Sequence, residues 1–207
     1  MSMSAKVLKA IEIAHRAHES QTRKGKNAAP YIIHPVFVGI QLSRLGYKEE
    51  VIIAGILHDV IEDGYSNLSR DEVKDMIKGC FGDKILKMVE DLSEPKDPSM
   101  SKEQREKTWE KRNQIKFDKL KDSIPEVRAI SAVDIYASLI ELEELIKQEG
   151  AEAGRYFNTS FKNKLDHMKK LLELYGESDR GCPYSVMISE IKEHVYNIEN
   201  KLNKLIK

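Results

Sequence analysis

Apolar residues recur along most of this chain three and four positions apart, which is the spacing of amphipathic α-helices. The pattern predicts one helix that ends near residue 20 and others over about 36–45, 49–63, 69–80, 81–94, 101–122, 124–148, 158–175 and 184–206. We find neither the alternation typical of β-strands nor an internal repeat. The expected fold class is therefore all-α, a single bundle of about eight to nine helices.

Local signals mark several ends of these helices. Pro35 suits the first turn of a helix, where its missing N–H costs nothing, and Gly46 is a typical stop. Ser69-Arg-Asp-Glu72 reads as a capping box that opens the next helix but one. The helix over 49–63 is apolar nearly all round, so we expect it at the centre of the bundle.

Length and composition limit the class of protein. The 207 residues are 41% hydrophobic and 33% charged, which favours a globular chain with a real core. We expect residues 1–180 to form one domain. Residues 181–207 should form a C-terminal helix packed on that domain or on a partner subunit, which leaves a homo-oligomer open.

Charge, cysteines and hydropathy bear on partners and location. Basic and acidic residues number 34 each, so the formal charge of zero gives no argument for nucleic acid or an anionic membrane as a partner. No stretch approaches the ~20 apolar residues of a membrane span. Cys80 and Cys182 lack a CxxC partner and resemble reduced thiols. These features predict a cytoplasmic protein.

Four polar residues interrupt the most apolar helix: His58, Asp59, Glu62 and Asp63. Positions three and four apart share a helix face, so one imidazole and three carboxyl groups should crowd one region. Burying several acids without a counter-charge is costly, and a divalent cation would neutralise them. Imidazole and carboxylate ligands together suit manganese, iron or zinc.

Two more residues could complete a metal site. His34 precedes Pro35, which disfavours helical conformation in the residue before it, so His34 is expected at a helix entrance. Asp134 is a lone acid in the apolar run AISAVDIYASLI. Each residue also has a structural explanation on its own, and a His-Asp pair alone is common. The joint occurrence of His34, His58, Asp59 and Asp134 is what favours a metal site.

The segments PYIIHP and AGILHDVIED carry a specific resemblance. They resemble the HD hydrolase domain of RelA/SpoT-type enzymes and small alarmone hydrolases, and the likeness extends over roughly residues 5–175. It implies a metal-dependent phosphohydrolase that removes the 3′-pyrophosphate of guanosine tetraphosphate (ppGpp), a small nucleotide. It also implies that His34, His58, Asp59 and Asp134 bind the metal, with manganese the usual ion. Glu62 and Asp63 match the acid pair that positions or activates the attacking water.

The loop QTRKGKNAAPY leads directly into His34 and carries three bases. By the same resemblance, Arg23 and Lys24 lie near the bound nucleotide, and Lys26 could help to neutralise phosphate charge. Tyr31 could stack on a base and could equally belong to the core. Three solvated bases on a surface loop are the commoner meaning of such a cluster, so both interpretations stay open.

The helix around Asp134 departs from the family pattern. Relatives read LADRLHN or LADKLYN there, whereas this chain reads AVDIYASL, with Ser131, Ile135 and Ser138 in place of a lysine, a basic residue and an asparagine. The metal site should persist while recognition of the nucleotide changes. Alternatives are therefore a phosphohydrolase of nucleoside monophosphates or cyclic nucleotides, or a nucleotide sensor without turnover. Trp109 is expected to anchor its polar helix, and His167 to lie at the surface.

Overall fold

A computed structural model describes residues 3–26, 28–63, 65, 67–94 and 100–205. Within these ranges the only strand-like feature is an isolated bridge between Thr22 and Pro30, so the all-α prediction is confirmed. Counting α3 and α4 as one interrupted helix, nine α-helices are described. The elements are α1 (Met3–Ala17), α2 (Ile33–Arg44), α3 (Glu49–Leu57), α4 (Val60–Asp63), α5 (Arg70–Phe81), α6 (Asp83–Leu92), α7 (Lys102–Lys121), α8 (Pro125–Glu149), the 3-10 helix η1 (Gly150–Tyr156), α9 (Phe161–Ser178) and α10 (Ser185–Leu205).

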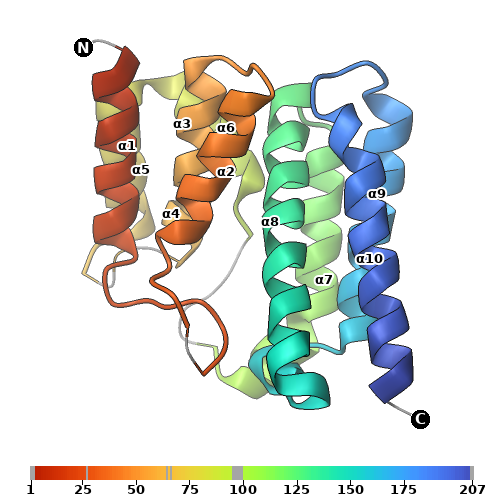
Figure 1. Cartoon of the computed structure of the whole chain (residues 1–207). Helices are drawn as coiled ribbons and strands as arrows, with labels where there is room; N and C mark the ends of the chain where they lie inside the picture. The colour runs from red at the N-terminus through yellow and green to blue at the C-terminus, as the bar shows by residue number, and fades with distance from the viewer. Residues whose placement is uncertain (1–2, 27, 64, 66, 95–99, 206–207) are drawn as a thin grey trace.

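The long helix α8 joins two groups of helices. Figure 1 shows α1 to α6 on one side of it and α7, α9 and α10 on the other. Helix α8 contacts α2, α3 and α6 of the first group, and α9 and α10 of the second. Residues of α8 can therefore meet residues that lie about a hundred positions earlier in the chain.

Helix α3 lies at the centre of the first group, as its sequence predicts. All its residues from Val51 to Leu57 are buried. Glycines let it approach α2 closely: a Cβ atom at Gly55 would lie 2.3 Å from Leu42 Cδ1, and one at Gly39 would lie 2.6 Å from Ile56 Cγ1. This close packing holds the start of α2 near the end of α3.

The prediction of one continuous helix over 49–63 is wrong. Helix α3 ends at Leu57, and α4 begins at Val60 after a turn at His58 and Asp59. The His58 ring donates a hydrogen bond from Nδ1 to the Gly55 carbonyl oxygen at 2.7 Å. In an uninterrupted helix that carbonyl would accept the backbone N–H of Asp59. The side chain thus competes with the backbone at the position where the helix breaks.

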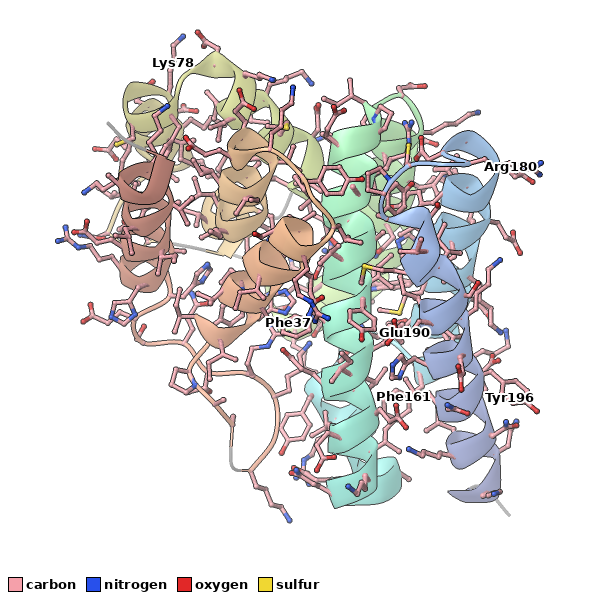
Figure 2. The ribbon with its side chains drawn as sticks, turned by 45° about the horizontal axis from the view of Figure 1, so that its top comes forward. Phe37, Lys78, Phe161, Arg180, Glu190 and Tyr196 are labelled. Atoms are coloured by element: carbon pink, nitrogen blue, oxygen red, sulfur yellow. The ribbon has the colours of Figure 1, made fainter. Side chains whose placement is uncertain are left out.

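The C-terminal helix α10 packs on α8 and α9 of its own chain. Two of its apolar residues, Val195 and Ile198, are buried there. Tyr136 of α8 donates a hydrogen bond to Glu190 of α10 at 2.7 Å and stacks on Phe37 of α2, which Figure 2 shows on the face where these helices meet. The boundary between residues 1–180 and 181–207 stays a prediction.

A buried ion pair ties the linker before α10 to the start of α8. Arg128 donates from Nε and Nη2 to both carboxylate oxygens of Asp179, at 2.6 and 2.7 Å, and the Tyr184 hydroxyl donates to the same carboxylate at 2.5 Å. None of the described helices has both the length and the apolar character needed to span a bilayer.

Candidate metal centre

Three helices bring the sequence-predicted ligands together. His34 lies in the first turn of α2, His58 and Asp59 form the turn between α3 and α4, and Asp134 lies in the middle of α8. The expectation that His34 would precede its helix is wrong, because α2 begins at Ile33. Pro35 occupies the first turn, as predicted, since a proline there removes no helical hydrogen bond.

The two histidines and Asp59 form a compact group. Potential ligand atoms of His34, His58 and Asp59 all lie within 4.8 Å of one another. The centroids of the two imidazole rings are 5.3 Å apart. Asp134 lies beside this group, with Oδ1 at 3.1 Å from His34 Nε2 and 3.8 Å from His58 Nε2. The structure therefore gathers all four residues at one place.

Their donor atoms fit a divalent cation. His34 and His58 are only 2% and 4% exposed. Among the described residues, His34 Nδ1 and His58 Nε2 are buried without a hydrogen-bond partner, although His58 Nε2 lies 3.2 Å from Asp59 Oδ2. Buried polar atoms are normally satisfied. A cation between the imidazole nitrogens and the carboxylates would satisfy them and neutralise the acids.

Electrostatics tie these groups together in the protein without a metal. Burial alone would lower the pKa of His58, but the neighbouring Asp59 carboxylate raises it to about 9. Burial opposes the ionisation of Asp59, yet the charge of His58 holds the pKa of Asp59 well below its usual range. In the same way, the hydrogen bond from His34 outweighs burial and lowers the pKa of Asp134. Protonated imidazoles thus supply the positive charge that a bound cation would otherwise provide.

Further contacts orient the candidate ligands. The Tyr31 hydroxyl donates to Asp59 Oδ2 at 2.7 Å, and the Ser138 hydroxyl lies 3.4 Å from Asp134 Oδ1. The Tyr31 ring stacks on His18 at a centroid distance of 4.4 Å. Hydrogen bonds of this kind hold ligands in the orientation that a metal needs. Tyr31 is therefore placed to position Asp59.

The basic loop reaches the site by one residue, Arg23. Its guanidinium binds Glu141, with Nε 2.6 Å and Nη2 2.5 Å from Oε2, and lies 4.8 Å from the centroid of the Tyr31 ring. Lys24 Nζ lies 4.3 Å from the centroid of the Phe157 ring. The Lys26 side chain is exposed, and its backbone N–H donates to Glu149 at 3.0 Å.

Sequence reasoning missed Glu141. Its Oε1 atom lies 3.5 Å from His34 Nδ1, so this carboxylate touches the candidate metal centre as well as Arg23. Glu141 follows Asp134 by two helical turns and therefore shares its face of α8. That spacing was the available signal.

The two acids after the ligand turn lie in α4. Glu62 Oε2 accepts the backbone N–H of Glu94 at 2.9 Å, which ties α4 to the end of α6. Glu94 itself pairs with Arg112 of α7 at 2.5 Å. The side chain of Asp63 lies outside the described part of the chain.

A cavity of about 150 Å³ adjoins Asp134 between α7, α8 and α9. The three positions that depart from the family pattern, Ser131, Ile135 and Ser138, all line it. Two lysines from other helices also line it: Lys116 of α7 and Lys164 of α9. Nothing in their local sequence indicated a role, because only the packing of α7 and α9 brings them to α8.

Comparison with known proteins follows the same pattern. The guanosine-3′,5′-bis(diphosphate) 3′-pyrophosphohydrolase of Aquifex aeolicus is 39% identical over 87 residues, covering 42% of this chain and 11% of that protein. The human guanosine-3′,5′-bis(diphosphate) 3′-pyrophosphohydrolase MESH1 is 33% identical over 97 residues, covering 46% of this chain and 51% of that protein. The matched segments thus span about half of the human relative and about a tenth of the long bacterial one.

Solved structures extend the likeness in fold over most of the chain. A structure described as a metazoan ortholog of SpoT that hydrolyzes ppGpp superposes with a TM-score of 0.67 at 22% identity, covering 90% of this chain and 93% of that one. The lmo0812 protein of Listeria monocytogenes gives a TM-score of 0.64 at 22% identity, covering 80% and 97%. The HD domain family matches residues 10–148, a range that contains all four candidate ligands. By this match over more than half of its length, the chain belongs to the HD domain family.

Proposed function

We propose that this protein is a metal-dependent phosphohydrolase that acts on a nucleotide, with guanosine tetraphosphate as the favoured substrate and its 3′-pyrophosphate as the group removed. The observation that carries the proposal is the gathering of His34, His58 and Asp59 within 4.8 Å, beside Asp134 and a cavity lined by lysines. The printed names of the relatives supply the substrate class.

His34, His58, Asp59 and Asp134 are the residues that would hold the divalent ion, and we propose manganese. Such an ion polarises a phosphoryl oxygen and lowers the pKa of a water molecule. Tyr31 and the Gly55 carbonyl keep Asp59 and His58 in place for this task.

Glu62 and Asp63 are proposed to position and deprotonate the attacking water. The water oxygen forms a bond to the phosphorus attached to the 3′ oxygen, and one water proton passes to this acid pair. The bond between that phosphorus and the 3′ oxygen breaks, and the 3′ oxygen takes up a proton. The products are guanosine diphosphate and pyrophosphate. Glu62 is held for this role by its bond to the Glu94 backbone.

The basic loop is proposed to assist binding of the substrate. Arg23 lies at the metal centre, and an anionic ligand would compete with Glu141 for its guanidinium. Lys24, Lys26 and Tyr31 complete the set, with Lys26 on the solvent side of the loop. We also place the protein in the cytoplasm, which agrees with two free cysteines, Cys80 and Cys182.

The test is release of pyrophosphate from guanosine tetraphosphate by the manganese-loaded protein, with metal content measured in the same samples. Asp59→Asn should lose both bound metal and turnover, because it removes a ligand and the charge that holds His58. Asp71→Asn, an exposed acid of α5, is the matched control and should retain both. Full activity of the Asp59→Asn protein would contradict the proposal.

A second candidate is a phosphohydrolase of different specificity. Ser131, Ile135 and Ser138 line the cavity beside Asp134 and offer neither the charge nor the amide that relatives place there. Release of product from a nucleoside monophosphate or a cyclic nucleotide, dependent on Asp59 and absent with guanosine tetraphosphate, would favour it. Tight nucleotide binding by the metal-loaded protein without any product would favour a sensor.

A further inference from the structure

Two lysines from outside the sequence motifs face the cavity beside Asp134. Lys116 comes from α7 and Lys164 from α9, and both line the cavity with Asp134. We propose that Lys116 and Lys164 bind the phosphoryl groups of the substrate and direct the rest of it into the groove between α7 and α9. The identity of the substrate rests on the proposed function, whereas the binding of phosphate by these lysines does not.

The charges around the cavity are left unbalanced on one side. Among the described residues, no carboxylate lies within 4.0 Å of either Nζ atom. Burial lowers the pKa of Lys164, and the positive charges of Arg23 and Lys116 lower it further. Burial also disfavours the charged form of Lys116, but the more distant acids Glu62 and Asp134 raise its pKa. Two ammonium groups that face one cavity repel each other, and an anion between them would remove that repulsion.

The cavity therefore has an acidic end and a basic end. Asp134 and the other candidate ligands form the acidic end, where a cation fits. Lys116 and Lys164 form the basic end. A phosphoryl group between the two ends would offer oxygens to both, which is the arrangement that phosphoryl transfer needs. Simple surface lysines would not converge on the metal centre in this way.

The basic loop is less well placed for the same task. Arg23 already makes two contacts with Glu141, and Lys24 lies over the Phe157 ring. The cavity between them is small, about 40 Å³. Space for a substrate thus lies on the side of α7 and α9.

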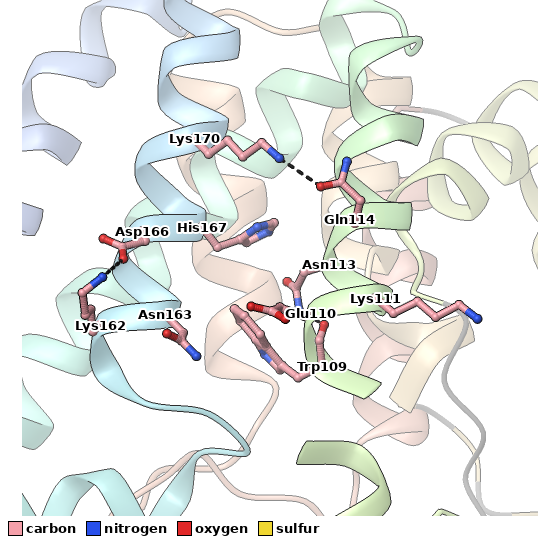
Figure 3. Close-up of a pocket in the computed structure, with 10 residues that line it drawn as sticks. All are labelled: Trp109, Glu110, Lys111, Asn113, Gln114, Lys162, Asn163, Asp166, His167 and Lys170. Carbon is pink, nitrogen blue, oxygen red and sulfur yellow. Dashed lines mark hydrogen bonds and ion pairs between the residues drawn. The ribbon is translucent and has the colours of Figure 1, made fainter. Parts of the chain in front are cut away.

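The groove beyond the lysines is large enough for the remainder of a nucleotide. Its volume is about 680 Å³, within the ~300–1,000 Å³ typical of small-molecule sites. Trp109 and His167 stand where it meets the cavity, since both line the two spaces, and their ring centroids are 5.9 Å apart. Figure 3 shows His167 on α9 and Trp109 on α7 reaching into the gap between these helices. Neither residue is the isolated anchor or surface histidine that the sequence predicts.

The chain carries its own reporter for this site, because Trp109 is its single tryptophan. The experiment compares the full-length, manganese-loaded wild-type protein with the double variant Lys116→Gln/Lys164→Gln. Inorganic phosphate is titrated while tryptophan fluorescence is followed, and KM and kcat for guanosine tetraphosphate are measured on the same preparations. The matched control is Lys121→Gln/Lys192→Gln, which removes two exposed lysines and so changes the net charge equally.

We expect the double variant to bind phosphate at least about tenfold more weakly and to show a raised KM, with unchanged metal content and melting temperature. The control should behave as wild type. Equal phosphate affinity and equal KM in the double variant and the control would overturn the proposal, even if the enzyme hydrolyses guanosine tetraphosphate.

The opposite split separates the two proposals. If phosphate binding depends on Lys116 and Lys164 but no preparation hydrolyses guanosine tetraphosphate, the anion site stands and the proposed substrate fails. A double variant that loses bound metal has lost its fold at the site. The single variants Lys116→Gln and Lys164→Gln then decide, each compared with its own single control, and phosphate affinity equal to the controls in both would overturn the proposal.

Discussion

Binding of manganese to the candidate metal centre should release protons, so its affinity should rise with pH. The pKa of His58 is raised to about 9 by Asp59, against the effect of burial. At pH 7 the charged imidazole therefore outnumbers the neutral one by about 100 to 1. The metal must displace this proton, at a cost of about 2.7 kcal/mol for two pKa units.

This reasoning predicts a rise in affinity of about tenfold for each pH unit between pH 7 and 9. His34 also has a raised pKa, since its bond to Asp134 outweighs burial, so a second proton steepens the dependence at the acidic end. The stability of the metal-free protein should change in the opposite direction. A raised folded-state pKa stabilises the fold fully below the unfolded value of about 6.5, and that contribution is lost as the pH rises through 9.

Calorimetric titration of manganese at pH 7.5, in two buffers of different ionisation enthalpy, counts the protons released. We expect about one or more per ion, and a metal-induced rise in Tm that grows from pH 6.5 to 9. His194→Gln is the control, because His194 pairs with Glu143 away from the site and should not alter the count. No proton release together with a flat affinity from pH 6.5 to 8.5 would refute the reasoning and show that both imidazoles are neutral without metal.

Arg128→Met should lower the free energy of unfolding in urea by about 3–5 kcal/mol, because it leaves the Asp179 carboxylate buried without its cation. Arg180→Met, whose side chain points to solvent in Figure 2, should change it by less than about 0.5 kcal/mol, and equal losses would count against this account. Tyr31→Phe should weaken manganese binding about 10–100-fold with unchanged helix content, since Asp59 loses its hydrogen bond; wild-type affinity would show that Tyr31 does not orient Asp59.

Most helix boundaries could be predicted because they depend on residues within four positions of one another. The expected helix over 124–148 is Pro125–Glu149 in the structure, and that over 101–122 is Lys102–Lys121. The capping box at Ser69 is confirmed, with both of its hydrogen bonds present. The break at His58 escaped prediction, because it follows from the direction of one side chain, which hydrophobic spacing does not record.

The sequence by itself determined which residues could bind a metal. Histidine before proline, the His-Asp pair and the lone acid Asp134 are recognisable from residue type and spacing, because imidazole and carboxylate chemistry is local to each residue. Tertiary structure alone decided what surrounds them. Glu141 takes the charge of Arg23, and Lys116 and Lys164 converge on Asp134, because helices distant in sequence pack side by side and so set the field at the site.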